Sequence, residues 1–199
     1  MMDSPYVRRV AISLKFFGLT FTHEPVSVFR HYEAFAAINP VVKAPSLVLD
    51  DGMVLMDSTL MLEYLDQLAP PARRLTPTTL VDLARSQRVI GLALAACDKS
   101  VQIIYENNLR PADKRHQPWI DRVRGQLLKA YGLLESECAS AKGWFFGARP
   151  LQADITAAVA WTFTQHELAD TVAAADYPAL SAFAKRAEAL PELLSSPME

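Results

Sequence analysis

Two motifs in the first third of the chain have the residue types of a small-molecule site. Asp57-Ser58 places a carboxylate and a hydroxyl just before an apolar helical pattern, where free N–H groups and the helix dipole favour a bound carboxylate. Pro45 lies between a polar loop and an apolar run, a place where a cis X–Pro bond would turn a backbone amide toward a ligand. Taken singly, the acid-Ser pair is better explained as a helix cap and Pro45 as an ordinary trans proline, but their spacing around an Asp-Gly hairpin favours a ligand site.

Ser4 is a third candidate, because its hydroxyl precedes Pro5 at the start of another helical pattern. Serine is a preferred N-cap, and proline is favoured at the first helical position. A thiol has a pKa of roughly 8.5 and is mostly un-ionised at neutral pH. A hydroxyl beside a helix N-terminus favours the thiolate. Ser4 is therefore either a plain cap or a thiol-activating group, and one oxygen can serve both roles.

The segments around these motifs predict a small α/β domain. Asp51-Gly52 is a strong hairpin signal between two short apolar runs. Pro45 is tolerated because it begins the first of these runs. The predicted elements are a helix ending at Gly18, a strand over 20–26, a short helix over 30–38, strands over 46–49 and 53–56, and a helix that Asp57 caps.

The rest of the chain predicts only helices. Residues 69–77 are rich in proline and arginine and are typical of a linker. Long apolar repeats at helical spacing follow over 79–108, 119–141, 151–168 and 177–190. We therefore expect an α/β domain over residues 1–68, a linker over 69–77 and an all-helical domain over 78–199.

Composition narrows the functional classes. The chain of 199 residues is 51% hydrophobic with a net charge of −2, which argues against a nucleic-acid-binding protein. No apolar run is long enough to span a bilayer, and the N-terminus lacks the pattern of a signal peptide. The two cysteines, Cys97 and Cys138, fit a reducing cytoplasm, and the scattered histidines do not suggest a metal site.

The order of motifs resembles the glutathione-binding half of the thioredoxin-like domain in glutathione S-transferases: proline, strand, turn, strand, then an acid-Ser pair opening a helix. The resemblance implies that glutathione is the co-substrate. It also implies that Ala44, before the cis-proline Pro45, pairs through its backbone with the cysteinyl part of glutathione. Asp57 and Ser58 would hold the γ-glutamyl ammonium and carboxylate. The helical second domain extends this resemblance over essentially the whole chain.

The start of the chain sharpens the resemblance toward serine-type bacterial members. Ser4-Pro-Tyr-Val-Arg-Arg-Val10 is similar to the Ser-Pro-Phe-x-Arg-Arg-Val start of the tau class, and the zeta class has its serine at a similar distance before the helix-ending glycine. The resemblance implies that Ser4 activates glutathione. We expect one of Arg8 and Arg9 to brace the domain interface and the other to be solvated.

Further residues follow from the same resemblance. Lys43 lies either near a carboxylate or the backbone of glutathione or on a solvated loop. Tyr6, Gln102 and Tyr105 are candidates for the walls of a second-substrate pocket between the domains. The chain is expected to form a homodimer, in which the small residues of Gly91–Ala96 either pack against a partner or lie inside the helical bundle.

Two departures from the family pattern stand out. Asp154 matches the acid of the family's capping motif, but Leu151 replaces the Ser or Thr cap, so half of the box is missing. Only three residues precede Ser4, whereas the family begins with a central strand. We therefore expect the first strand to be absent or shortened in this chain. Because a missing central strand would leave backbone groups without partners, we also expect either that the true start lies upstream of Met1 or that the chain is truncated.

The leading functional hypothesis is transfer of the glutathione thiolate to a small electrophile, as in detoxification. One alternative is a zeta-like glutathione-dependent isomerase, although the Ser-Ser-Cys start of that class is absent. Another is a non-catalytic interaction protein on the same fold, since fold alone does not settle function.

Overall fold

The computed structural model describes residues 1–198, which form two compact units. One unit comprises Met1–Thr76 together with the segment that begins at Leu190, and the other comprises Pro77–Ala189. The helical domain expected from the sequence, residues 78–199, included the segment from Leu190. This segment joins the first unit because Arg8 and Lys15 of the first helix bond to Ser196 and Ser195.

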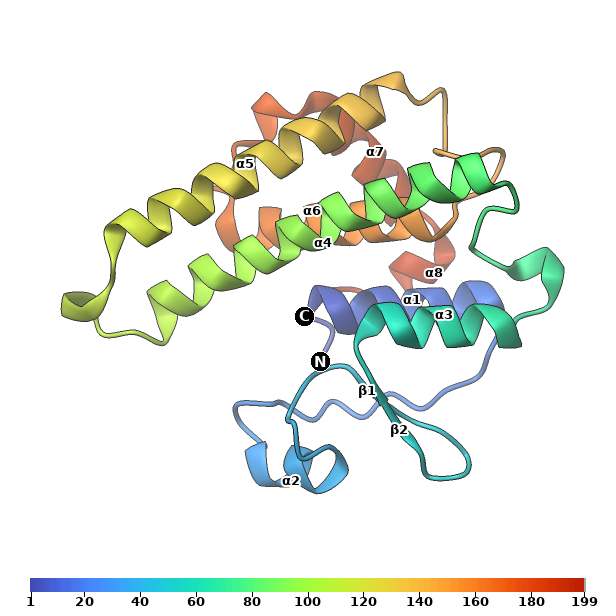
Figure 1. Cartoon of the computed structure of the whole chain (residues 1–199), viewed down its shortest axis with the longest axis horizontal. Helices are drawn as coiled ribbons and strands as arrows, with labels where there is room; N and C mark the ends of the chain where they lie inside the picture. Colours follow the sequence, from blue (N-terminus) through green and yellow to red (C-terminus); the bar gives the residue numbers. More distant parts are fainter. Residues whose placement is uncertain (199) are drawn as a thin grey trace. The chain divides into compact units, whose positions relative to one another are not determined.

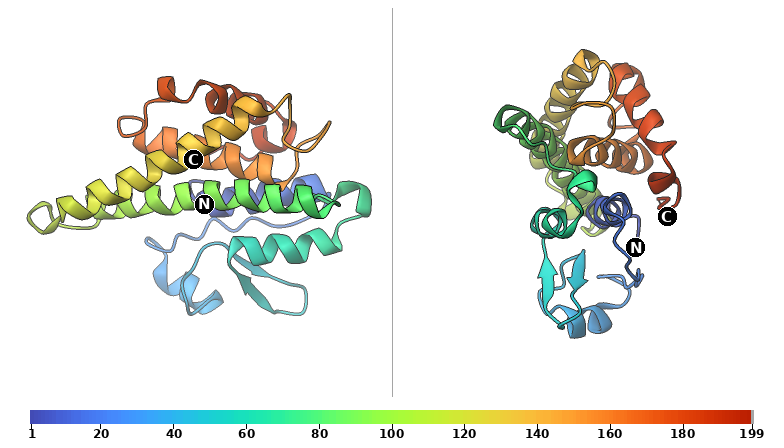
Figure 2. Two further views of the ribbon diagram at one scale, coloured as in Figure 1. Left: turned by 45° about the horizontal axis from the view of Figure 1, so that its top comes forward. Right: turned by 90° about the vertical axis from the view of Figure 1, so that its right-hand side faces the viewer.

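The first unit has a pair of helices on one side of a short hairpin (Figures 1 and 2). Helix α1 (Pro5–Phe17) is capped by Ser4, whose Oγ accepts the Val7 N–H at 3.4 Å, and is followed by Gly18 with a φ of 74°. It lies beside α3 (Ser58–Leu68). Beyond the hairpin lies α2 (Tyr32–Ile38), and α8 (Pro191–Leu194) packs on α1.

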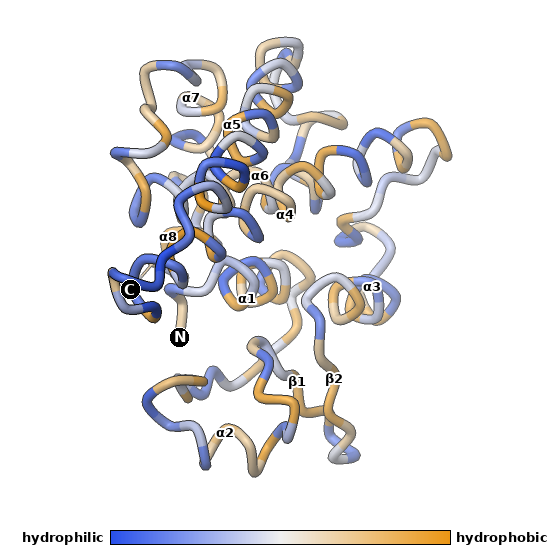
Figure 3. The backbone as a smooth tube through the Cα atoms, turned by 60° about the vertical axis from the view of Figure 1, so that its left-hand side comes forward, coloured by the Kyte–Doolittle hydropathy of each residue, from blue (hydrophilic) through white to orange (hydrophobic). Residues whose placement is uncertain are grey.

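The sheet has two antiparallel strands, β1 (Ser46–Val48) and β2 (Val54–Met56), with Leu47 opposite Leu55. Apart from Ser46 at the start of β1, both strands consist of apolar residues (Figure 3). A type I′ turn requires positive φ at both central residues, but only Gly52 has it, with a φ of 86°. The turn is therefore not of this type, and the Gly52 N–H instead bonds to the Leu49 carbonyl at 2.9 Å.

The strand predicted over 20–26 is wrong. This segment is extended, but within residues 1–198 no other strand pairs with it. Residues 1–3 contain no strand and turn directly into α1, in agreement with the expected absent or shortened first strand.

The second unit is a helical bundle (Figure 1). Its core joins the helices α4 (Leu80–Asn108), α5 (Gln117–Ser140) and α6 (Gln152–Leu168). They meet at a buried hydroxyl cluster, in which Thr164 Oγ1 lies 2.6 Å from Tyr131 Oη and 2.8 Å from Ser100 Oγ. Ala93 and Ala96 of the small-residue stretch are fully buried, which supports packing inside the bundle for these two residues. This unit also contains the helix α7 (Pro178–Glu188) and 3₁₀ turns at Ala112–Lys114 and Ala174–Asp176. The first unit has a 3₁₀ turn at Pro71–Arg73.

No helix among the described residues has the length and apolar character needed to cross a membrane.

Candidate functional site

The loop before β1 is held by a short chain of hydrogen bonds. Asn39 donates from Nδ2 to Ser46 Oγ at 2.8 Å, and Ser46 donates to the Lys43 carbonyl at 2.9 Å. The same asparagine accepts the Val41 N–H at 3.0 Å. The peptide bond between Ala44 and Pro45 is cis, the geometry that the sequence pattern favoured. Asn39 and Ser46 were not singled out from the sequence, because polar loop residues are too common to be informative.

Asp57 links this loop to the start of α3. Its Oδ1 accepts the Thr59 N–H at 2.9 Å, and Lys43 Nζ lies 3.3 Å from its Oδ2. Burial alone would raise the pKa of Asp57, but the hydrogen bonds from Thr59 and Lys43 outweigh it and lower the pKa below its usual value. Both side chains of the ion pair are about half exposed, so a charged carboxylate stands at the surface.

The backbone of Asp57 is unusual. Its φ is 71° with a ψ of 115°, a region that non-glycine residues rarely adopt and that costs of the order of 1–3 kcal/mol. Aspartate and asparagine tolerate positive φ better than most residues. Such strained backbones cluster at ligand sites. Here the strained turn holds the Asp57 carboxylate and the Ser58 hydroxyl next to each other at the start of α3.

Ser58 is the first residue of α3 and is almost completely buried. Its Oγ accepts a hydrogen bond from Arg9 Nη1 of α1 at 3.2 Å, and Thr59 Oγ1 accepts another from the same nitrogen at 3.4 Å. Arg9 was not singled out as a site residue, because a buried arginine in a helix cannot be distinguished by sequence from a solvated one.

Arg8 and Arg9 are each only 2% exposed, so the expectation that one of them is solvated is wrong. Arg8 Nε donates to the Ser196 carbonyl at 2.8 Å, a contact within the first unit. Consecutive arginines on one helix point in different directions, and here each direction offers a buried acceptor.

Ser4 lies at the N-terminus of α1, where its Oγ accepts the Val7 N–H. The distance of 3.4 Å is long for a hydrogen bond, so the capping contact is weak. Within residues 1–198, the Ser4 hydroxyl donates to no protein atom. Its proton is thus available to an outside acceptor such as a sulfur anion, while the helix dipole favours negative charge at the same end.

The structure brings five of the predicted positions into one continuous region: the loop carrying Lys43, Ala44 and Pro45 meets the Asp57-Ser58 turn through the Lys43–Asp57 ion pair. Ser4 is connected to this region through α1, because Arg9 of the same helix bonds to Ser58.

The predicted second-substrate residues divide between the two units. Gln102 and Tyr105 of α4 line one pocket of about 550 Å³, together with Trp119 at the start of α5. Gln102 Nε2 also donates to Asp98 Oδ2 at 2.8 Å. Tyr6 belongs to the first unit, and its place in a pocket with Gln102 and Tyr105 stays a prediction.

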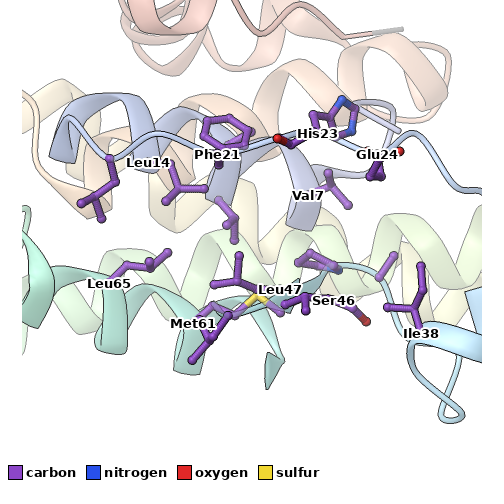
Figure 4. A pocket seen from close by; sticks show the side chains of 18 of the residues that line it. Val7, Leu14, Phe21, His23, Glu24, Ile38, Ser46, Leu47, Met61 and Leu65 are labelled. Carbon is purple, nitrogen blue, oxygen red and sulfur yellow. The ribbon is translucent and has the colours of Figure 1, made fainter. Parts of the chain in front are cut away.

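A cavity of the first unit adjoins the loop of Ala44 and Pro45. It has a volume of about 1070 Å³ and lies between the two helices and β1 (Figure 4). Ala44 and Pro45 are the only predicted site residues that line it; the rest of its lining is mostly apolar, including Val7, Leu14, Phe21, Leu47, Met61 and Leu65. Its charged lining residues, Glu24, Asp50 and Asp51, are acidic, and no lysine or arginine among residues 1–198 lines it to bind a peptide with two carboxylates.

The cysteines show no features of a reactive site. Cys97 and Cys138 are both buried free thiols, and burial raises the pKa of Cys138 to about 12, which keeps it un-ionised and poorly nucleophilic. Among residues 1–198, no cluster of three or more histidine, cysteine, aspartate or glutamate side chains is arranged to hold a metal.

Comparison with known proteins agrees with this geometry. The model of the glutathione S-transferase N-terminal domain matches residues 1–73, and that of the C-terminal domain matches residues 117–186. A maleylacetoacetate isomerase of Pseudomonas aeruginosa is 32% identical over 165 residues, which cover 76% of this chain and 72% of that protein.

Two solved bacterial structures are similar over nearly the whole chain. A glutathione S-transferase of Methylobacterium radiotolerans in complex with glutathione sulfonate is 26% identical with a TM-score of 0.86, covering 98% of this chain and 91% of that one. A glutathione transferase family member of Pseudomonas fluorescens with bound glutathione is 28% identical with a TM-score of 0.84, covering 100% and 97%. With both domain models matched, the chain belongs to the glutathione S-transferase family.

Proposed function

We propose that this protein binds glutathione and transfers its thiolate to a small electrophile. The observation that carries this proposal is the turn at Asp57-Ser58, where a charged carboxylate and a buried hydroxyl open α3 next to the loop of Ala44 and Pro45. A γ-glutamyl group carries an ammonium and a carboxylate on one carbon, and this turn offers a partner of the right type for each.

Lys43 supports the assignment of Asp57. Its ammonium lies 3.3 Å from Asp57 Oδ2, so this oxygen accepts a cationic partner. The pair is exposed, and an exposed ion pair is worth less than about 1 kcal/mol. An incoming γ-glutamyl ammonium can therefore displace Lys43, which is then free to contact a carboxylate of glutathione.

The chemistry rests on Ser4. Its hydroxyl donates a hydrogen bond to the glutathione sulfur and so favours the thiolate, while the thiol proton leaves to solvent. The sulfur lone pair then forms a bond to the electrophilic carbon as the leaving group departs with its electron pair. With a chloro-nitroaromatic substrate the products are the thioether, chloride and a proton.

Glutathione binding is tested by calorimetry and by turnover with a chloro-nitroaromatic electrophile. Asp57→Asn removes the charge, tolerates positive φ and keeps an oxygen for the Thr59 N–H. We expect it to weaken binding about tenfold or more, because hydrogen bonds between charged groups are worth about 1.5–3 kcal/mol. Asp51→Asn in the exposed hairpin turn is the matched control and should leave affinity unchanged.

Absence of binding by the wild-type protein at millimolar glutathione would contradict the proposal. Binding without turnover on any electrophile would instead indicate a glutathione-binding protein that is not a transferase.

A second candidate is glutathione-dependent isomerisation, which the relationship to a maleylacetoacetate isomerase favours. In that reaction the thiolate would add to a cis double bond, the carbon–carbon bond would rotate, and elimination would regenerate glutathione. Turnover of maleylacetoacetate without net loss of glutathione would identify this activity. Stoichiometric consumption of glutathione with the chloro-nitroaromatic compound, and no isomerisation, would identify the transferase.

We also propose that the protein is a homodimer that uses α3. Leu60, Tyr64 and Leu68 recur at spacings of four on this helix and are 61%, 39% and 53% exposed, which makes an apolar stripe typical of an interface. Leu60→Glu should convert a dimer into a 22.0 kDa monomer in light scattering. Leu194→Glu, at a similarly exposed leucine of α8, should remain dimeric; a monomeric wild type would contradict the proposal.

A further inference from the structure

Two neighbouring arginines of α1 provide a natural comparison. Arg8 and Arg9 have the same chemistry and the same 2% exposure, but they bond to different parts of the first unit. Arg8 donates to the Ser196 carbonyl, whereas Arg9 donates to the hydroxyls of Ser58 and Thr59. Only Arg9 therefore touches the turn to which the γ-glutamyl group is assigned.

The bond from Arg9 determines the direction of the Ser58 hydroxyl. A guanidinium has N–H donors and no acceptor, and it stays charged at every pH at which proteins are studied. Ser58 Oγ must therefore accept from Arg9 Nη1 at 3.2 Å, and its own proton points elsewhere. A hydroxyl fixed in this way can donate to an anion but is a poor partner for an ammonium.

The charges around Ser58 also favour a bound anion. The Arg9 guanidinium carries a positive charge into the interior behind Ser58, where the lower dielectric strengthens electrostatic interactions. Ser58 and Thr59 are also the first residues of α3, so the positive end of the helix dipole adds to that charge. Asp57, one residue earlier, carries the negative charge that suits an ammonium.

We propose that Arg9 is a positioning residue that makes Ser58 a hydrogen-bond donor and so selects the α-carboxylate of the γ-glutamyl group. This inference rests on the proposed glutathione function. Arg9 acts through Ser58 and does not contact the sulfur, so it affects glutathione affinity and KM rather than the chemical step.

The test compares glutathione with 4-aminobutyryl-cysteinyl-glycine, which keeps the amino group but lacks the α-carboxylate. In calorimetry, Arg9→Gln should weaken glutathione roughly 10- to 100-fold, the range of a hydrogen bond to a charged group. The same change should alter affinity for the analogue less than about threefold. KM for glutathione should rise similarly while kcat stays within about threefold.

Arg8→Gln is the matched control, since it removes an equally buried charge without touching Ser58. It should affect glutathione and the analogue equally. If Arg9→Gln also affects both ligands equally, Arg9 has only a structural role and the inference is overturned. If the wild-type protein binds neither ligand, the proposed function itself has failed, which is a different result.

A second measurement covers the case in which Arg9→Gln does not fold. Arg9→Lys keeps the charge but lacks the planar fork of donors. Ser58→Ala should weaken glutathione binding in the wild type and add little in the Arg9→Lys background, because the two residues act as one unit. Fully additive effects would overturn the inference.

Discussion

Replacing Ser4 with alanine is expected to lower kcat/KM for conjugation roughly 100-fold, with protein folding retained. The loss of a single hydrogen-bond donor to a negatively charged reacting atom typically costs about 10²–10³ in rate. The Ser4 hydroxyl donates to no protein atom within residues 1–198 and stands at the positive end of α1, so its removal takes away the proposed donor to the sulfur. The pKa of enzyme-bound glutathione, followed by thiolate absorbance, should rise toward that of the free thiol.

The capping role of Ser4 must be separated from its chemical role. Alanine at an N-cap costs about 1 kcal/mol, whereas glycine costs only a few tenths. Ser4→Gly and Ser4→Ala should therefore differ in melting temperature but lose activity equally, and Ser4→Thr should retain activity. Full activity in Ser4→Gly would show that the serine is only a cap and that another group activates the thiol.

Replacing Asp154 is expected to lower the free energy of unfolding more than the other substitutions proposed for this protein. Asp154 is fully buried, and its two oxygens accept the Phe145 and Leu151 N–H groups, each at 2.8 Å. Leu151 has no oxygen with which to complete a capping box, so Asp154 alone satisfies these donors. Asp154→Ala should cost roughly 3–5 kcal/mol, since each hydrogen bond to a charged group is worth about 1.5–3 kcal/mol.

The matched control is Asp82→Ala, which changes the acid at the same position of α4. Asp82 is only partly buried, and its partner Thr79 keeps its own cap on the Asp82 N–H at 3.1 Å. Its loss should cost less than about 1 kcal/mol. Urea unfolding of both variants gives the comparison, and equal losses would contradict a special role for Asp154.

The raised pKa of Asp154 should make the stability of the fold depend on pH. Burial raises the pKa of Asp154 to about 6, although the hydrogen bonds from Leu151 and Phe145 act in the opposite direction. The folded state then binds this proton more tightly than the unfolded chain, so stability falls as pH rises from about 4 to 6. The stability advantage of wild type over Asp154→Asn should shrink across this window and stay constant above it. An advantage that grows with pH would show that the hydrogen bonds outweigh burial.

Local sequence signals predicted the helices well because they act within a few residues. Ser4, Pro5 and Gly18 begin and end α1 where the sequence indicated, since caps and positive φ depend on the chain itself. The strand over 20–26 was predicted from alternation alone and is wrong. A strand also needs a neighbouring backbone, and alternation does not say whether one is present.

The candidate site shows the same division. The sequence by itself determined which groups are available: the Asp57-Ser58 pair, the loop of Ala44 and Pro45, and the Ser4 hydroxyl. Only the tertiary structure decided that Lys43 pairs with Asp57 and that Arg9 reaches Ser58 across two helices. The physical reason is that the burial of a charge and the direction of a hydroxyl depend on distant partners, which no local pattern records: Lys43 and Asp57 are 14 residues apart in the sequence, and Arg9 and Ser58 are 49 apart.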